Sequence, residues 1–128
     1  MNIEKLKSDL RMRDLFFPEC YVKRSVQISD GKLDIDVSRD IVKKTNNEYD
    51  VTVSIHIQKE DLEAKVVACA TFYIDRPDTS DVDTLIKSNT VAIMFPFIRS
   101  QVSLLTTQPG MVPIVLPPIN TARLNISE

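Results

Sequence analysis

The chain has 128 residues, enough for one domain with a modest core, and we expect residues 1–128 to form a single domain. A composition of 43% hydrophobic and 27% charged residues is typical of a soluble globular domain and excludes a disordered chain. The net charge is −2, and Lys and Arg are interspersed with Asp and Glu, so we expect no nucleic-acid partner. The sequence has no long apolar run and no signal-like N-terminus, which predicts a cytoplasmic protein without membrane insertion.

The N-terminal third predicts β structure. Residues 2–14 fit either a helix, with apolar residues at helical spacing, or the start of a strand at Leu10. Residues 16–29 are rich in aromatic and β-branched residues and predict a strand, and strict alternation over 32–39 predicts a second one. Because glycine tolerates the positive φ of a tight turn, Asp30-Gly31 predicts that these two strands form a hairpin.

Two further strands are expected in the middle of the chain. The polar residues 43–47 predict a loop or a bulge, and alternation over 49–58 predicts a strand with one buried and one wet face. The return strand, 62–74, is apolar on both faces over part of its length, so both faces should be covered. Small residues at alternate positions favour close approach of a second subunit. The residues predicted at this subunit contact are Ala64, Val66 and Ala68.

The helical part follows. A short helix capped by Thr79 or Ser80 is expected first, and Asn89-Thr90 predicts a second cap before a long helix. The long helix should begin around Phe95-Pro96, because proline fits a first helical turn, and should end near Thr107. The elements together predict an α+β fold, a four-stranded antiparallel sheet with a long helix of the C-terminal half packed on it.

The long helix has an apolar arc about 200° wide, more than one contact surface needs. Six residues form this arc: Met94, Phe97, Ile98, Val102, Leu104 and Leu105. A narrow polar stripe consists of Arg99, Ser103 and Thr106. The width predicts either a helix between a sheet and a second subunit, or an arc that is partly open to a ligand.

The segment after the helix contains three prolines, Pro113, Pro117 and Pro118. Because proline lacks a backbone donor, residues 111–120 can form only an edge strand or an extended loop laid against the helix.

The order of these features resembles the SecB protein-export chaperone family. In the C-terminal half the resemblance rests on Phe95-Pro96, Phe97, Arg99, Pro113, Leu116, Pro118 and Asn120. In the strands it rests on Lys32-Leu-Asp-Ile-Asp36, Tyr49-Asp-Val-Thr-Val53 and Phe72-Tyr-Ile74. The resemblance implies a helix lying across a four-stranded antiparallel sheet, and a tetramer built as a dimer of dimers. It also implies a holdase that binds unfolded polypeptides such as preproteins, without ATP or any other cofactor, in hydrophobic grooves between helix and sheet.

For such a groove we expect large apolar or aromatic side chains that accept varied partners. The residues predicted to line it are Phe16, Phe17, Tyr21, Met94, Phe97 and Val102. All six could instead belong to the core.

Two features depart from the SecB pattern. Only residues 121–128 follow the Pro-x-Asn segment, where the family continues into a second helix, and Lys65 stands where a family acid on the SecA-docking surface would fall. Both put SecA in doubt as a partner. Some SecB-like proteins instead guard the antitoxin of a toxin–antitoxin pair, and that alternative stays open.

An enzyme is the least favoured alternative. His56 is the single histidine and lies on the polar face of a predicted strand, and no cluster has metal-ligand spacing. Only two glycines occur, so no phosphate-binding loop is expected, and Cys20 and Cys69 form no C-x-x-C pair. A small thioesterase remains conceivable by fold analogy alone. We therefore expect no enzyme activity, no metal and no cofactor.

Overall fold

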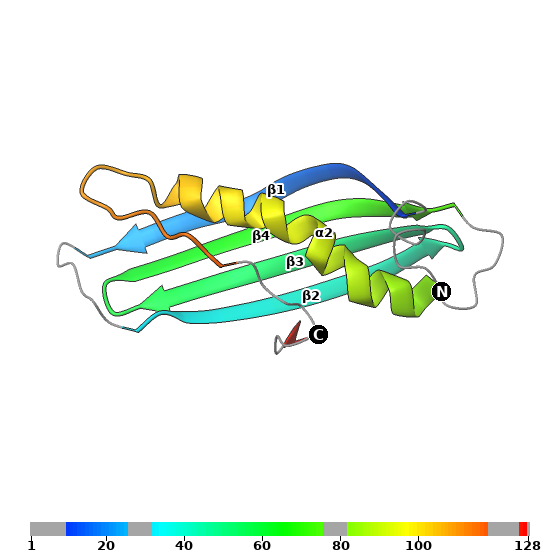
Figure 1. Ribbon diagram of the computed structural model, residues 1–128, viewed down its shortest axis with the longest axis horizontal. Helices are drawn as coiled ribbons and strands as arrows, with labels where there is room; N and C mark the ends of the chain where they lie inside the picture. Colours follow the sequence, from blue (N-terminus) through cyan, green and yellow to red (C-terminus); the bar gives the residue numbers. More distant parts are fainter. Residues whose placement is uncertain (1–9, 26–31, 76–81, 118–125, 128) are drawn as a thin grey trace.

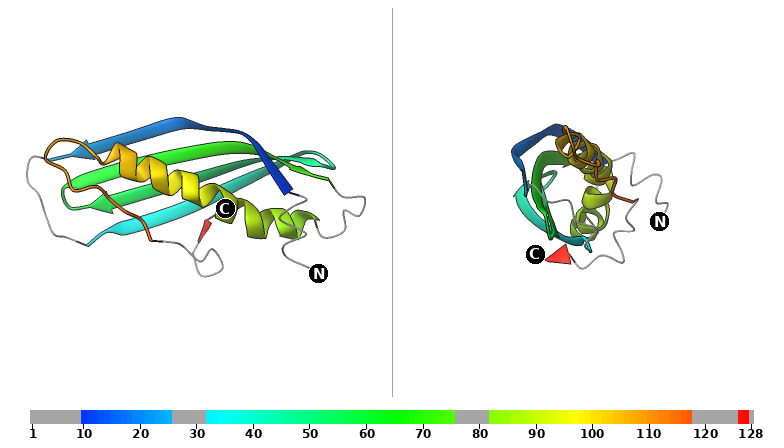
Figure 2. Two further views of the ribbon diagram at one scale, coloured as in Figure 1. Left: turned by 45° about the horizontal axis from the view of Figure 1, so that its top comes forward. Right: turned by 90° about the vertical axis from the view of Figure 1, so that its left-hand side faces the viewer.

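The computed structural model describes residues 10–25, 32–75, 82–117 and 126–127. This part of the chain forms one sheet and one long helix. The elements are β1 (Leu10–Arg24), β2 (Asp34–Thr45), β3 (Glu48–Lys59), β4 (Leu62–Ile74), α2 (Val82–Leu105) and β5 (Ile126–Ser127). The helix lies diagonally across one face of the sheet (Figure 1), and the sheet curves around it (Figure 2).

The strand order is β1-β4-β3-β2-β5. The first four strands are antiparallel to their neighbours, and β5 is parallel to β2. The prediction of a four-stranded antiparallel sheet with a long helix packed on it is therefore confirmed. The short β5 adds a fifth strand at the β2 edge.

The predicted hairpin between the first two strands is wrong. β1 pairs with β4 and β2 pairs with β3, so the β3–β4 hairpin separates β1 from β2. The turn proposed for this hairpin, Asp30-Gly31, lies outside the described residues. Alternation in a sequence fixes which side chains share a face, whereas the neighbour of a strand is decided by contacts distant in sequence, such as Val22 beside Ala64.

The other strand expectations fare better. For residues 2–14 the alternatives were a helix or a strand beginning at Leu10. A strand does begin at Leu10, and residues 2–9 lie outside the described part. The polar segment 43–47 contains a register shift between Lys43 and Thr45, which confirms a bulge, and then the turn into β3. β3 and β4 occupy the predicted spans.

The core lies between the helix and the sheet face that it covers, which we call the inner face. The buried apolar side chains of β3 and β4 all point to this face. They are Tyr49, Val51, Val53, Ile55, Ile57, Ala64, Val66, Ala68, Ala70, Phe72 and Ile74. The helix contributes Ile86, Val91, Met94, Phe95, Ile98 and Val102. The opposite, outer face carries Phe16, Val67 and Cys69 among polar side chains, and no helix or strand of the described residues covers it, unlike the cover expected on both faces of β4.

The two predicted helices are one helix of 24 residues. Asn89 and Thr90 do not cap a new helix, because their side chains donate to carbonyl oxygens one turn earlier, those of Leu85 (3.0 Å) and Ile86 (2.7 Å). Pro96 lies inside the helix rather than in its first turn, and the helix ends at Leu105. Cap-forming residue types also bond within a helix, and burial of a continuous apolar face against the sheet favours the unbroken helix. Thr79 and Ser80 lie outside the described residues.

The helix is tied to both halves of the sheet. Arg39 of β2 donates to the carbonyl oxygen of Lys87 in the first half of the helix. Gln101, in the second half, lies with its side-chain nitrogen 3.7 Å from the sulfur of Cys20 in β1. These contacts lie at the two ends of the diagonal course of the helix in Figure 1. The side of the helix that faces away from the sheet, which we call its open side, is not covered by the sheet.

Candidate functional site

The six residues predicted to line a binding groove occupy three different places. Met94 and Val102 are fully buried in the core beneath the helix. Phe17 packs against that core from β1. Phe16 and Tyr21 belong to the outer face of β1, and Phe97 lies on the open side of the helix with 47% of its surface exposed. The structure therefore does not bring these six residues together in one groove.

The residues predicted at a subunit contact lie on the inner face. Ala64, Val66 and Ala68 are at most 1% exposed in a single chain, because the helix of the same chain covers them. Their small size therefore serves the packing of β4 beneath α2, and a second subunit cannot contact them without opening the core. This placement differs from the expectation.

An exposed apolar surface does exist, on the open side of the helix and on the segment that follows. Phe97 and Leu104 project from the helix, and Val112 and Val115 from the extended segment 111–117. Each is between 47 and 83% exposed. We call these four side chains the apolar ridge. Large apolar side chains that stay exposed together indicate a contact surface for a partner.

A hollow of about 590 Å³ lies between the helix and the extended segment, and two residues of the ridge, Leu104 and Val115, line it. Half of its lining is apolar: Pro96, Leu104, Val115 and Leu116. The polar half consists of Arg99, Ser100, Ser103 and Thr107. Apolar walls with a few polar groups suit a peptide, whose backbone needs hydrogen bonds and whose side chains need apolar contacts.

The polar stripe of the helix holds the extended segment in place. Arg99 Nε donates to the carbonyl oxygen of Leu116 (2.8 Å), and Ser103 Oγ donates to that of Ile114 (2.9 Å). The buried hydroxyl of Thr106 accepts from the Ile114 amide (2.8 Å) and donates to the Val102 carbonyl (2.8 Å). The expected extended loop laid against the helix is thus observed, as Figure 1 shows in orange. These bonds fix the spacing between the two sides of the hollow.

Sequence reasoning missed Val112 and Val115. The signal was present, because prolines on both sides of Val115 prevent this segment from entering the middle of a sheet. Its apolar side chains could therefore not all be buried. Leu104 was placed in the apolar arc, but helical spacing alone could not say that the sheet covers only part of that arc.

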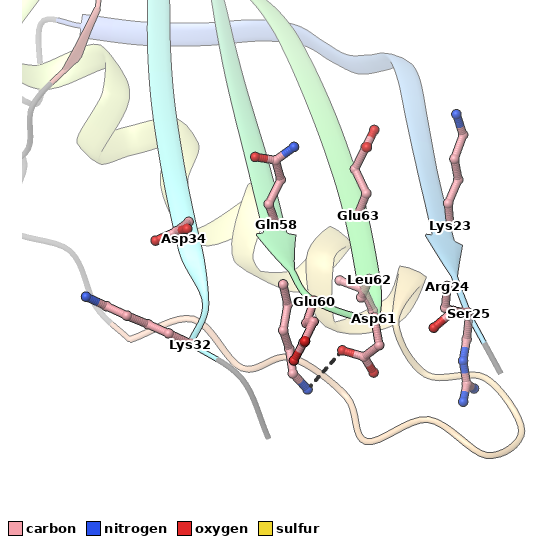
Figure 3. Close-up of a pocket in the computed structure, with 11 residues that line it drawn as sticks. Lys23, Arg24, Ser25, Lys32, Asp34, Gln58, Glu60, Asp61, Leu62 and Glu63 are labelled. Atoms are coloured by element: carbon pink, nitrogen blue, oxygen red, sulfur yellow. Dashed lines mark ion pairs between the residues drawn. The ribbon is translucent and has the colours of Figure 1, made fainter. Parts of the chain in front are cut away.

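Two further hollows lie at the end of the sheet where β3 turns into β4. One, about 230 Å³, is bounded by the extended segment at Gly110, Met111, Val112 and Ile114 and by Leu62. Gly110 has a φ of 78°, which favours glycine at the turn that begins this segment. The other, about 480 Å³, is lined by charged side chains of both signs, including Lys23, Lys32, Asp34 and Glu63 (Figure 3). Balanced charges give this second hollow no preference for anions or cations.

The outer face carries a polar network. Tyr21 donates its hydroxyl to Glu63 Oε1 (2.8 Å), and His56 Nε2 lies 3.6 Å from the same oxygen. The hydrogen bond from Tyr21 lowers the pKa of Glu63, with a further lowering from His56, and the same bond raises the pKa of Tyr21. Beside them, Lys65 pairs with Glu19 (3.0 Å), which raises the pKa of Lys65. Tyr21 thus belongs to a surface network rather than to an apolar groove.

This network leads to a prediction about pH. A folded-state pKa below the unfolded value stabilises the fold above the unfolded pKa, and this contribution disappears as the pH falls through the folded pKa. Tyr21→Phe should therefore raise the pKa of Glu63 and lower the melting temperature near pH 7. It should have no such effect at about pH 2, where the carboxyl is protonated in both states. NMR titration of Glu63 and thermal melts test this. Tyr73→Phe, which keeps the ring that Arg13 covers, is the control; an unchanged Glu63 pKa in Tyr21→Phe would contradict the prediction.

Within the described residues no group of three or more His, Cys, Asp or Glu side chains lies together in a way that could hold a metal ion. Cys20 and Cys69 are free thiols. No helix in the described part is long and apolar enough to span a membrane.

A four-stranded antiparallel sheet, crossed on one face by a long helix that a proline-containing extended segment follows, defines a class of α+β proteins with the SecB-like fold. The family described as preprotein translocase subunit SecB matches residues 8–127. Because this match covers nearly the whole chain, the protein belongs to the SecB family. The resemblance seen in the sequence is confirmed.

Individual relatives are distant. The SecB-like chaperone of Mycobacterium tuberculosis, solved in complex with a ChAD peptide from the HigA1 antitoxin, superposes with a TM-score of 0.73 at 17% identity, covering 91% of this chain and 92% of that one. The protein-export protein SecB of Magnetococcus marinus is 22% identical, covering 90% of this chain and 78% of that protein. An uncharacterized protein of Methanocaldococcus jannaschii is 45% identical over a segment that spans 31% of this chain and only 27% of that protein.

Proposed function

We propose that the protein is an ATP-independent chaperone, a holdase that binds unfolded or extended polypeptides on the apolar ridge. The observation that carries this proposal is the ridge itself: Phe97, Leu104, Val112 and Val115 remain exposed outside the core of the described chain. A large apolar side chain gains about 1.5–3 kcal/mol when it is buried, so four exposed ones are costly unless a partner covers them.

The shape of the surface favours an extended polypeptide over a compact ligand. The ridge residues come from the helix and from the extended segment, and the hollow between these two segments is open to solvent. The SecB-like chaperone of Mycobacterium tuberculosis was solved with an antitoxin peptide, which supports a peptide as the kind of ligand. Preproteins are the clients that the family description suggests, and an antitoxin is the alternative.

The proposal includes a homo-oligomer, a dimer of dimers, in which other copies cover part of the exposed apolar surface. The inner face does not supply the contact, because α2 covers it, which leaves the open side of the helix, the outer face and the sheet edges. SecA is not included. Lys65, which pairs with Glu19 (3.0 Å), stands where the family resemblance implies an acid on the SecA-docking surface.

Two exposed phenylalanines give a matched test of the client site. Phe97 belongs to the ridge and Phe16 to the outer face, and their exposed fractions are 47% and 56%. Phe97→Ser should weaken binding of an unfolded client about tenfold, the loss that about 1.4 kcal/mol of apolar burial gives, with little change in melting temperature. Phe16→Ser should leave the affinity unchanged.

The measurement is delay of aggregation of a reduced, unfolded test protein, together with titration of a labelled apolar peptide. A wild-type protein that delays no aggregation and binds no extended peptide would refute the chaperone proposal. If Phe16→Ser weakened client binding and Phe97→Ser did not, the client site would have to be assigned to the outer face of the sheet.

A further inference from the structure

The outer edge of β2 is a second place where the described structure meets an extended polypeptide. β2 pairs with β3 along its whole length, from Asp34 to Thr45. On its other edge, among the described residues, Ile126 and Ser127 pair in parallel with Val37 and Ser38. Figure 1 shows β5 as a short arrow beside β2. The chain's own residues thus demonstrate that this edge accepts a strand.

The rest of this edge has the properties of a strand template. Exposed strand edges are usually protected by charged side chains, above all lysine, by proline or by a bulge. Residues 34–42 contain no lysine, proline or bulge, and their charged side chains are Asp34, Asp36, Asp40 and Arg39. The bulge between Lys43 and Thr45, and the lysines beside it, come only at the end of β2. Ile35 and Val42 are 36% and 52% exposed, so apolar surface accompanies the edge.

The edge of β1 differs. It contains Pro18, and Asp14 has a φ of 56°. Its register with β4 shifts twice between Arg13 and Glu19. Such irregularities prevent a long added strand from keeping its hydrogen bonds with β1, and residues 34–42 of β2 have no such irregularity.

The side chains of β2 define what would pair with it. Successive residues of an added strand point to opposite faces. On the inner face they would meet Ile35, Val37, Arg39 and Ile41, and on the outer face Asp34, Asp36, Ser38, Asp40 and Val42. A fitting strand therefore alternates apolar residues with lysine or arginine. β5 follows the apolar half of this pattern, because Ile126 is in register with Val37 and the polar Ser127 with Ser38.

We propose that the β2 edge between residues 34 and 42 binds a client segment by strand addition. The client segment is an extended polypeptide in which apolar and basic residues alternate. β5 occupies part of this site until the client displaces it. This inference rests on the proposed chaperone function and adds a second, backbone-directed contact to the apolar ridge. Strand addition recognises the backbone, which every client shares, while the alternating pockets select the side chains.

The test uses the full chain, a chain lacking residues 126–128, and a nine-residue peptide that alternates valine and lysine. Hydrogen exchange should show slower exchange of the β2 amides when the peptide is added, without the same change in β1. Removing residues 126–128 should increase the peptide affinity about tenfold, the change expected when one or two competing backbone hydrogen bonds are lost. The same peptide with alternate amides N-methylated on its pairing edge should bind at least tenfold more weakly.

Several results would overturn the inference. Peptide binding without protection of β2, or with equal affinity for the N-methylated peptide, would do so while leaving the chaperone proposal intact. Protection of β2 that rises with protein concentration in the absence of peptide would assign the edge to a second copy of the chain. If neither the peptide nor an unfolded test protein binds, both proposals fail.

Discussion

Phe72→Ala is expected to lower the free energy of unfolding by about 3–5 kcal/mol, a large share of the 5–15 kcal/mol typical of a domain. Phe72 is among the largest side chains of β4 and is 0% exposed, and it faces the helix from the middle of the inner face. The substitution removes the apolar contacts of the ring and leaves a cavity that the sheet and the helix can fill only by moving closer together. The loss should appear as a shift of the urea midpoint with an unchanged slope.

Phe16→Ala is the matched control, since Phe16 lies on the neighbouring strand but is 56% exposed on the outer face. It should change the free energy of unfolding by no more than about 0.5 kcal/mol, as expected for a surface substitution. Equal losses for the two phenylalanines would mean that the outer face is buried in the assembled protein. The core would then lie on both sides of the sheet.

Ala68→Lys should unfold the protein. Ala68 is 0% exposed beneath the helix, so a lysine there would bury an unpaired ammonium group, which costs several kcal/mol, and would also overfill the space between β4 and α2. The sequence alone placed Ala68 at a subunit contact, where the same change would dissociate an oligomer of folded chains. The two outcomes are separable, because circular dichroism reports folding and light scattering reports assembly.

Val67→Lys is the control on the adjacent residue. Val67 points to the outer face opposite Glu19, so a lysine there remains hydrated and lies near an opposite charge. The variant should fold and assemble as the wild type does. A folded, monomeric Ala68→Lys protein would show that β4 contacts another subunit rather than its own helix.

The sequence by itself determined the local features of this protein. Period-two alternation defined β3 and β4 and the face that each side chain occupies, because a strand has no other way to separate apolar from polar residues. The prolines after the helix predicted an extended segment, and the polar stripe of Arg99, Ser103 and Thr106 marked the side of the helix on which it lies. The order of motifs was sufficient to identify the family.

Tertiary structure alone decided which elements are neighbours. A turn signal at Asp30-Gly31 is local, whereas the pairing of β1 with β4 depends on contacts between residues more than 40 positions apart, such as Tyr21 and Glu63. Similarly, Asn89, Thr90 and Pro96 are signals for helix starts, and the burial of one continuous apolar face against the sheet overrode them.

The same limit applies to the candidate site. Helical spacing gathered Met94, Phe97, Val102 and Leu104 into one wide arc, and the sequence cannot state how much of an arc a sheet will cover. The curved sheet buries Met94 and Val102, and the hydrogen-bonded extended segment borders the remainder, so that Phe97 and Leu104 stay exposed beside Val115. Whether a helix residue is buried depends on the surface that packs against the helix. For these residues that surface is formed by strands and by an extended segment that are distant in the sequence.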